Sequence, residues 1–445
     1  MASAYLTRTF SSAGNRRKWT WSGWYKRGSL GSQGNLFAVS SGSTSFHLIY
    51  FDGNNKLAHN INQISCNTNA AYKDVNAWYH VIFTIDTAQA TASDRVKIYV
   101  NGVQQSTTGS YPAQNNEMTI NTTVRHDISN QGAHYSNNNY YDGSMSHLHF
   151  CDGYAYSASD FGETDATTGI WKPKTSPTVT YGTNGFFLKF DNSANMGLDS
   201  GGGSNNLTTS GTIIQTKDTP SNVFATLNPL ASINDTPTFS NTNNTIVVQN
   251  ASAFGAQSTL GMSKGKYYAE FKMTASSDND MAVGVNSDTN APRTDLGPGF
   301  GTHSTAYRET GTLAVNGSDD ISYGNSYAVN DIVGIAIDLD NNKLYFSKNG
   351  VFQNSGVPTS GSTGTGARSI TAADSTESGF YFFNAGSHSS SQGGTWQANF
   401  GNGYFGTSAV ASAQSPDDGN GIFEYDVPAG YRALCTKSLN AQEYS

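Results

Sequence analysis

The stretches RVKIYVNGVQQ (residues 95–105) and KLYFSKNGVFQ (residues 343–353) repeat one pattern about 250 residues apart. Each follows a second alternating run, HVIFTID at 80–86 and VGIAIDLDNN at 333–342. Apolar residues recur at every second position, and an Asn-Gly pair ends the later strand, which is typical of antiparallel hairpins. The repeat therefore predicts two central hairpins, one in each of two β-sandwiches.

The alternation also predicts which side chains face the two cores. Successive side chains of a strand point to opposite faces, so residues two apart share a face. The expected inner faces carry Val81, Phe83 and Ile85 in the first hairpin and Val333, Ile335 and Ile337 in the second.

The composition supports an all-β chain. The 445 residues are 36% hydrophobic and 13% charged, with 47 Gly, 24 Tyr and 23 Phe. Aromatic residues favour strands and Gly favours turns, whereas long runs with helical apolar spacing are hard to find. We expect two cores, few helices and a surface kept soluble by Asn, Ser and Thr.

Proline marks a change in the text near the middle of the chain. Pro220, Pro229 and Pro237 are spaced through a segment rich in Asn, Thr and Ser. Because proline fixes its own backbone and lacks an N–H, this segment reads as an extended connector. The sequence thus predicts a domain at 1–215, a linker at 216–244, a second sandwich at 245–410 and an extension at 411–445 that packs on the second domain.

Charge and cysteine content exclude several classes of protein. A net charge of −8 argues against nucleic acid as a partner, since phosphate binding leaves a basic surface. Cys66, Cys151 and Cys435 are too scattered for a disulfide framework or a zinc site, which favours folding in a reducing cytoplasm. No apolar run reaches membrane-spanning length.

Short phrases in both halves resemble known domain families. Trp21 and Trp24, followed by WYHV at 78–81 and YVNG at 99–102, resemble the LamG or pentraxin-like branch of the concanavalin A-like jelly rolls. KGKYYAEFKM, then VGIAIDLDNNKLYFSKNG, and then a late Phe-Tyr-Phe strand resemble a SPRY domain. The resemblance implies two concanavalin A-like jelly-roll β-sandwiches in tandem, joined by the Pro/Asn/Thr-rich linker; such folds host many functions.

A narrower resemblance concerns three phrases: DGYAYSASDFGETDATTGIWKPK (152–174), YGTNGFFLKFDNSANMGLDSGG (181–202) and DTPSNVFATLNPL (218–230). They are similar to text found in virion proteins of tailed bacteriophages that carry a LamG-like unit before a SPRY-like unit. The resemblance implies a tail fibre, tail spike or capsid-surface appendage. Its partners would be other virion proteins and host-surface glycan, and it would sit on the virion surface after assembly in the host cytoplasm, as a homo-oligomer with the trimer favoured.

Sugar binding needs exposed aromatic rings beside amide or carboxylate groups, and NQGAHYSNNNYYDG at 130–143 supplies both. An equally weighted alternative is that these tyrosines pack down on the sandwich or on a neighbouring subunit. The SPRY resemblance points in addition to loops at one end of the second sandwich. The predicted ligand-binding residues are Tyr135, Asn138, Tyr140, Tyr141 and Asp142 in the first unit, and Arg293, His303, Tyr307, Arg308 and His388 in the second.

Closely spaced acidic pairs are the candidates for glycan hydrolysis: Glu163 with Asp165, Asp338 with Asp340, and Glu424 with Asp426. The Glu-x-Asp-x-Glu strand of the glucanases with this fold is absent, and each pair lies beside a turn residue. We therefore expect no enzymatic activity.

Metal ligands are also sparse. His147 and His149 lie two apart, and we expect them on one strand face with Met145 and Cys151, which favours a packed histidine pair over a ligand pair. LamG-like domains often bind calcium at the rim of the sandwich, and the oxygens for such a site could come from Asp52, Asn54, Asp142 or Asp152. Calcium binding therefore stays an open alternative. We predict no other cofactor and no bound metal.

The leading hypothesis is a non-enzymatic phage virion structural protein, a tail fibre or surface appendage that binds host-surface carbohydrate. The alternative is a purely structural capsid or tail decoration or joining protein. The third is a polysaccharide depolymerase that depends on Glu163 and Asp165.

Overall fold

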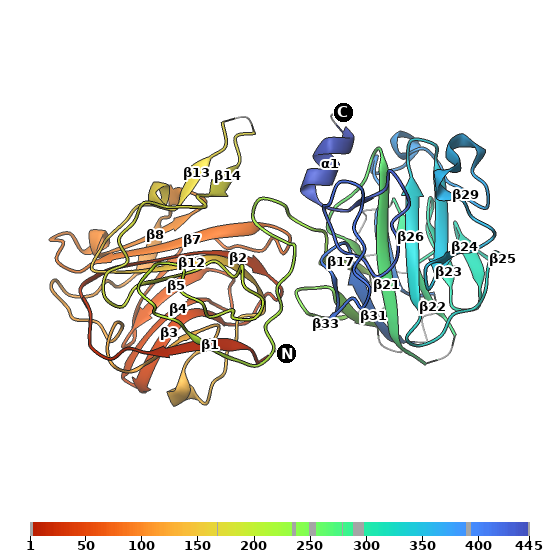
Figure 1. Cartoon of the computed structure of the whole chain (residues 1–445). Coiled ribbons are helices and arrows are strands. Elements are labelled where there is room, and N and C mark those ends of the chain that lie inside the picture. The colour runs from red at the N-terminus through yellow and green to blue at the C-terminus, as the bar shows by residue number, and fades with distance from the viewer. Residues whose placement is uncertain are drawn as a thin grey trace. The chain divides into compact units, whose positions relative to one another are not determined.

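The computed structural model describes residues 3–166, 168–233, 237–248, 255–277, 279–287, 298–388 and 393–443. The chain divides into two compact units, Met1–Gln215 and Thr216–Ser445. Each unit is described by itself below, and each is a pair of layered sheets (Figure 1).

The first unit consists of an eight-stranded and a six-stranded antiparallel sheet. In order across it, the eight-stranded sheet contains β10 (Thr107–Gly109), β6 (Ile64–Thr68), β5 (Leu57–Ile61), β4 (Ser45–Phe51), β3 (Gly34–Gly42), β11 (Arg125–Ile128), β1 (Tyr5–Thr9) and β16 (Thr208–Ser210). The six-stranded sheet contains β15 (Phe186–Leu188), β12 (Gly143–Asp152), β2 (Lys18–Arg27), β7 (Trp78–Asp86), β8 (Val96–Val100) and β9 (Val103–Gln104). A separate hairpin is formed by β13 (Gly162–Thr164) and β14 (Trp171–Pro173).

The core of the first unit lies between these two sheets. Val81, Phe83 and Ile85 are fully buried in it, which confirms the predicted inner face of the first hairpin. Trp21 of β2 stacks on Phe37 of β3 with ring centroids 4.2 Å apart and planes 6° apart. The aromatic pair joins the two sheets, so the strand that the sequence marks by its tryptophans lies at the centre of the sandwich.

The two histidines predicted on one face of a strand both lie against Phe187, but Met145 and Cys151, predicted on that same face, are separated from each other. The register between β12 and β2 shifts between Ser146 and His149, and His147 has a φ of 47°. A bulge of this kind inserts one extra residue and reverses the face of everything after it. As a result Met145 packs toward the core whereas Cys151 lies on the outer face.

The second unit has a seven-stranded sheet that contains β17 (Leu227–Ile233), β20 (Gly255–Ser258), β30 (Phe382–Ser387), β22 (Met281–Asn286), β23 (Thr305–Arg308), β24 (Thr312–Val315) and β25 (Ser318–Ser322). Its nine-stranded sheet contains β18 (Thr238–Ser240), β19 (Thr245–Val248), β31 (Gly394–Asn399), β21 (Lys266–Ser276), β26 (Ile332–Asp338), β27 (Lys343–Lys348) and β28 (Val351–Phe352), with β29 (Arg368–Ser369) paired to β27 and β34 (Arg432–Ala433) paired to β21. A small hairpin joins β32 (Tyr404–Phe405) and β33 (Ser408–Ala409).

The second hairpin of the sequence forms the middle of this nine-stranded sheet. Val333, Ile335 and Ile337 are fully buried, as the alternation predicts. Ile335 pairs with Phe346 and Ile337 pairs with Leu344 across β26 and β27. The two repeats thus occupy equivalent central places in their own sandwiches.

The segment 216–244, predicted as an extended linker, lies within the second unit and contains strands β17 and β18. Leu227 is fully buried in the core of that unit. Pro229 is compatible with β17 because this strand forms the edge of its sheet, where a missing N–H removes no internal ladder bond. The spaced prolines therefore belong to a segment that includes an edge strand, and in the sequence alone such a segment has the same features as an extended connector.

Residues 411–435, here called the C-terminal strap, cross the outer face of the nine-stranded sheet. Tyr268 and Tyr431 are buried in the apolar cluster between the strap and the sheet. At its centre Glu270, fully buried on β21, accepts hydrogen bonds from the backbone N–H groups of Glu424 (2.8 Å) and Tyr425 (2.9 Å). One carboxylate therefore fixes the strap to the sheet.

Helical structure in the described residues is short. It comprises η1 (Ala92–Arg95), η2 (Ala133–Tyr135), η3 (Ala158–Asp160), η4 (Pro358–Thr363), η5 (Ala373–Ser375) and α1 (Thr436–Glu443). The all-β prediction is confirmed. Across the described ranges, no helix has the length and apolar character that crossing a membrane requires. Cys66, Cys151 and Cys435 are free and buried.

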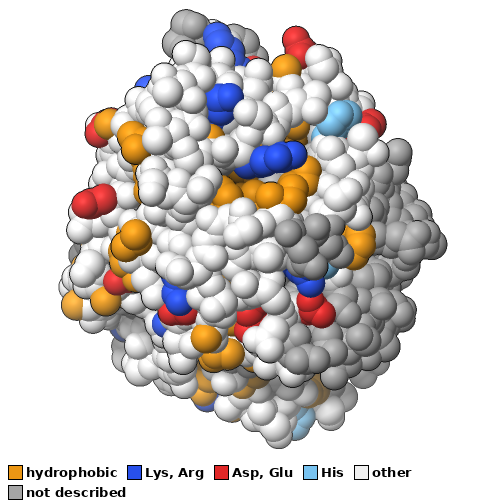
Figure 2. All heavy atoms as spheres, turned by 90° about the vertical axis from the view of Figure 1, so that its right-hand side faces the viewer, with side chains coloured by type: hydrophobic (Ala, Val, Ile, Leu, Met, Phe, Trp, Pro, Cys, Tyr) orange, Lys and Arg blue, Asp and Glu red, His pale blue; other side chains and the backbone are white. Residues whose placement is uncertain are grey.

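Figure 2 shows one face of the second unit, where uncharged polar side chains and backbone dominate and charged groups are scattered. This pattern agrees with a surface kept soluble by Asn, Ser and Thr.

Candidate functional site

The outer face of the six-stranded sheet is covered by residues 153–183, here called the outer segment. Two threonine hydroxyls of the sheet hold it in place. Thr20 donates to the carbonyl of Tyr154 (2.8 Å) and accepts from the N–H of Tyr156 (2.9 Å). Thr84 donates to the carbonyl of Tyr156 at 2.5 Å. The position of both tyrosines is thus set by the sheet below them.

The chain then turns through η3. Ser157 and Asp160 form a capping box, in which the backbone N–H of Ser157 donates to Asp160 Oδ2 at 2.7 Å and its hydroxyl donates to the same oxygen at 2.8 Å. A Ser followed three residues later by an acidic residue is the sequence signature of this turn. The turn buries Phe161 and brings the chain into strand β13.

Strand β14 returns beside β13 and is anchored by Trp171. Its indole N–H donates to His80 Nδ1 at 2.9 Å, and His80 Nε2 lies 2.9 Å from the Ser22 hydroxyl. Because an indole N–H can only donate, His80 must be the neutral tautomer with its proton on Nε2. Burial lowers the pKa of His80 to about 3, which keeps it neutral. Gly162 leaves room for the indole, since a Cβ there would lie 2.4 Å from the ring.

Between η3 and the end of the hairpin the outer segment forms an open hollow of about 400 Å³. It is lined by Asp160, Glu163, Lys174, Thr175, Ser176 and Thr178. The lining therefore combines two carboxylates, one ammonium group and three hydroxyls. Lys174 donates to the carbonyl of Ser159 at 2.6 Å, so its ammonium group is held at the wall. The volume is that of a small-ligand site, but the lining is polar.

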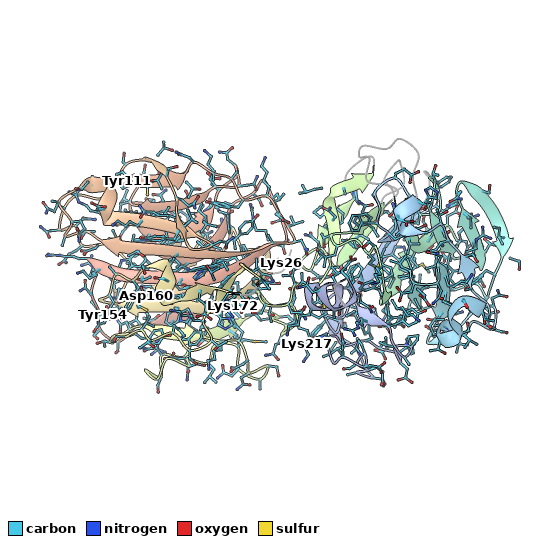
Figure 3. The ribbon with its side chains drawn as sticks, turned by 90° about the horizontal axis from the view of Figure 1, so that it is seen from above. Lys26, Tyr111, Tyr154, Asp160, Lys172 and Lys217 are labelled. Carbon is cyan, nitrogen blue, oxygen red and sulfur yellow. The ribbon has the colours of Figure 1, made fainter. Side chains whose placement is uncertain are left out.

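An exposed aromatic plane lies beside this hollow. The ring of Tyr154, which is 41% exposed, stacks on Tyr156 with centroids 5.7 Å apart and planes 14° apart. The Tyr156 hydroxyl accepts from the N–H of Thr180 at 2.8 Å, two residues past Thr178 of the lining. Figure 3 shows Tyr154, Asp160 and Lys172 on the same side of the first unit. One face of Tyr154 is packed and the other is open to a ligand.

The acidic pair of β13 is bridged by a lysine. Lys172 Nζ lies 2.9 Å from Asp165 Oδ2 and 3.7 Å from Glu163 Oε1. Asp165 also accepts from the N–H of Thr168 at 2.9 Å. Glu163, Asp165 and Lys172 thus form an ion-paired turn. A glycosidase instead needs two carboxylates that face each other across the bound sugar.

Two segments of the chain match family models. Residues 2–161 match the concanavalin A-like lectin/glucanases superfamily, and residues 266–370 match the SPRY domain. The chain carries a concanavalin A-like domain followed by a SPRY domain. The order that the sequence resemblance predicts is confirmed.

Several solved structures are similar in fold. The SPRY domain of human HERC1 is 15% identical, with 39% of this chain and 96% of that chain covered and a TM-score of 0.29. The PSpry domain of TRIM65 is 16% identical, with 39% and 91% covered and a TM-score of 0.27. The heptameric SAP-like pentraxin from Limulus polyphemus is 16% identical, with 35% and 71% covered and a TM-score of 0.27. No curated protein matches the sequence.

The tyrosine-rich loop of the concanavalin A-like domain is largely packed down. Tyr135 is half-buried against Phe46, with centroids 6.2 Å apart, and Tyr140 lies 6.0 Å from Tyr5. Tyr141 is buried and its hydroxyl donates to the carbonyl of Lys26 at 2.8 Å. The predicted ligand contact by Tyr141 is wrong, because its polar tip is used inside the sandwich.

The remaining predicted residues of this loop are more open. Asn138 is exposed and Asp142 is half-buried, and burial raises the pKa of Asp142. The alternative hypothesis, in which the tyrosines pack onto the sandwich, describes most of this loop.

In the SPRY domain the predicted residues do not form one open site. Tyr307 is fully buried, its hydroxyl donates to the carbonyl of Asn325, and its ring packs among other core aromatics. His388 is buried and stacks on Phe300 at 4.1 Å. Ligand roles for Tyr307 and His388 are therefore wrong, because both side chains serve packing.

Two further predicted residues make ion pairs. Arg308 Nη2 lies 2.7 Å from Asp280 Oδ1, and His303 Nδ1 lies 2.9 Å from Glu377 Oε2. The backbone N–H of His388 donates to the carbonyl of Asp280 at 2.8 Å, so Arg308 and His388 meet around this residue. Arg293 lies outside the described residues.

Two of the carboxylates considered for calcium, Asp52 and Asp152, accept hydrogen bonds from N–H donors. Asp52 Oδ1 accepts from the backbone of Asn54 (2.9 Å) and of Lys56 (2.8 Å). Asp152 Oδ1 accepts from the N–H of Asn15 (2.7 Å) and the Asn121 amide (2.6 Å). Such oxygens cap turns and do not fit a cation that needs six or more ligands. In the part of the chain that is described, no three His, Cys, Asp or Glu are grouped to hold a metal.

The sequence reasoning singled out Glu163 as an acid and missed the rest of the hollow. Tyr154 and Tyr156, two residues apart, would share one face of an extended segment and could have been recognised as an aromatic platform. The hydroxyls of Thr175, Ser176 and Thr178 carry no distinct signal in a chain so rich in Ser and Thr. Only the fold brings them opposite Asp160.

Proposed function

We propose that the chain is a non-enzymatic surface protein of a bacteriophage particle that binds host-surface carbohydrate through its concanavalin A-like domain. The observation that carries the proposal is the polar hollow of residues 160–178 beside the open ring of Tyr154. A sugar ring has an apolar face that packs on an aromatic plane and a rim of hydroxyls that needs donors and acceptors. The hollow and the tyrosine supply these two features side by side.

The match of residues 2–161 to lectins and glucanases supports a carbohydrate ligand. Binding without hydrolysis is supported by Lys172, which bridges the acidic pair and lies closer to Asp165, and by the turn that holds Asp165. General acid catalysis on a glycosidic bond needs a carboxyl group that is free to reach the leaving oxygen, whereas Asp165 is held by Lys172 and by the N–H of Thr168.

The virion location is supported by the resemblance of residues 152–174, 181–202 and 218–230 to tailed-phage virion proteins. The first of these phrases contains Tyr154, Asp160 and Glu163, so the resemblance covers the hollow itself. As an appendage of this kind the chain would act as a homo-oligomer, with the trimer favoured, and would contact other virion proteins. Labelling of intact particles with an antibody to the hollow tests the location. Access to the antibody agrees with adhesion, and a hollow buried against other virion proteins would identify a decoration or joining protein instead.

Replacing Tyr154 by alanine is expected to weaken binding of the full chain to host envelope polysaccharide by about fivefold or more, because a partly exposed aromatic anchor of a binding site typically contributes about 1 kcal/mol or more. The measurement is a binding titration on immobilised polysaccharide. Phe380 in the SPRY domain has a similar exposed fraction, 43% against 41%, so Phe380→Ala is the matched control and should leave affinity unchanged. Equal affinity of Tyr154→Ala and the unmodified chain would contradict the proposal.

A further inference from the structure

The charge of the hollow is unevenly balanced. Its lining has two carboxylates, Asp160 and Glu163, and one ammonium group, Lys174. Lys174 is held by the carbonyl of Ser159. The nearest further cation, Lys172, lies closer to Asp165 (2.9 Å) than to Glu163 (3.7 Å) and is largely balanced by it. A ligand in the hollow therefore meets a net negative wall.

The lining offers both hydrogen-bond acceptors, from its carboxylates, and groups that can donate or accept, from its hydroxyls. Both hydrogen bonds that Ser157 donates in the capping box go to Asp160 Oδ2, which leaves Asp160 Oδ1 without a hydrogen-bond donor among the described residues. The side chain of Glu163 is 49% exposed. Carboxylate oxygens accept charge-assisted hydrogen bonds from hydroxyl groups, and the three lining hydroxyls can donate or accept. The set suits a ligand that presents several O–H donors.

From this balance we infer that the hollow selects an uncharged sugar unit and discriminates against sugars that carry a carboxylate. The inference rests on the proposed carbohydrate binding and specifies its ligand class. Sugar hydroxyls donate to Asp160 and Glu163 while the ring packs on Tyr154. A uronic or sialic acid would bring a third carboxylate to the same wall, where like charges repel and the one ammonium group of the lining, Lys174, balances only one of the two carboxylates already present.

The test compares neutral hexoses with their uronic acids, which differ only in the oxidation state of carbon 6. Glucose with glucuronic acid, galactose with galacturonic acid and mannose with mannuronic acid are used as competitors against host polysaccharide bound to the full chain. For the pair that competes best, the neutral member is expected to bind about three- to tenfold more tightly at low salt, from the repulsion of one added charge at the edge of a solvated site. The ratio should shrink as salt screens that repulsion.

Two variants locate the effect. Glu163→Gln removes one negative charge from the hollow and should bring the neutral-to-acidic ratio close to one. Glu117→Gln is the matched control, because Glu117 has a similar side-chain exposure, 52%, and pairs with Arg16 and Arg17 away from the outer segment. It should leave the ratio unchanged.

The outcomes separate the two proposals. A uronic acid that binds as tightly as its neutral partner, or an unchanged ratio in Glu163→Gln, would overturn the inference while carbohydrate binding stands. If neither the polysaccharide nor any sugar binds, the proposed function itself fails. A ratio that narrows equally in Glu117→Gln would mean that overall charge, and not the hollow, discriminates.

Discussion

Acidification from pH 7 to pH 4 is expected to unfold the concanavalin A-like domain. This domain buries several histidines in neutral form: burial lowers the pKa of His59 and His80 to about 3 and that of His126 to about 4, and it holds the pKa of His47 and His149 well below the ordinary value. In the unfolded chain the same groups titrate near pH 6.5.

The sign follows from proton uptake. As the pH falls below about 6.5, the unfolded chain binds protons that the folded domain cannot accept, so the free energy of unfolding falls until about pH 3 to 4. At pH 4 the loss is about 3 kcal/mol each for His59 and His80, an order-of-magnitude figure for fully buried groups. The sum over the histidines reaches the total stability of a typical domain.

Tryptophan fluorescence follows this transition selectively, because five of the six tryptophans lie in the first unit: Trp19, Trp21, Trp24, Trp78 and Trp171. His59→Leu should move the acid midpoint to lower pH, since it removes one buried base. His134 is exposed, so His134→Leu is the control and should leave the midpoint in place. Native fluorescence that persists at pH 3 would contradict this expectation. So would an acid-unfolding midpoint that is the same in His59→Leu as in the unmodified chain.

Replacing Glu270 by alanine is expected to lower the free energy of unfolding of the SPRY domain by about 3–5 kcal/mol, since it leaves two backbone N–H groups and one N–H of the Asn399 amide without their acceptor in a buried site. The measurement is hydrogen exchange at the amides of Glu424 and Tyr425, which should lose protection. Glu377→Gln, at a largely exposed carboxylate, is the control. Unchanged protection in Glu270→Ala would show that apolar packing alone holds the C-terminal strap.

Glu270 also gives the SPRY domain a pH dependence of opposite sign. Burial raises the pKa of Glu270 to about 7, against about 4.5 for an ordinary glutamate. The folded domain therefore holds a proton that the unfolded chain has lost, and this contribution to stability is present below pH 4.5 and is lost as the pH rises through 7. Glu270→Gln cannot titrate, so its stability should vary less across this range.

The sequence predicted most of what determines the fold. Period-two alternation places Val81 and Ile335 in their cores because residues two apart share a face of the strand, and the more apolar face packs between the two sheets. Asn-Gly turns set the register of the short strands that follow the central hairpins, β9 beside β8 and β28 beside β27. Such patterns involve residues close together in the sequence, so they can be recognised without knowledge of the tertiary contacts.

The candidate site could not be predicted in the same way. Tyr141 and Tyr307 are of a residue type that often contacts ligands, but the hydroxyl of each donates a hydrogen bond to a backbone carbonyl. The difference depends on which surface lies above them, and that surface comes from distant parts of the chain. The hollow likewise exists because Trp171 docks on His80, 91 residues earlier in the sequence. An edge strand with Pro229 looks like a linker for a related reason, since its partner strand is not its sequence neighbour.

The proposed function places bound carbohydrate in the hollow beside Tyr154. A crystal structure of the full chain with the tightest-binding saccharide tests this claim directly. We predict one sugar ring against the open face of Tyr154, with hydroxyls in hydrogen-bond contact with Asp160 or Glu163. A sugar bound instead on the loop at 130–142 or on the SPRY domain, with nothing at residues 160–178, would contradict it.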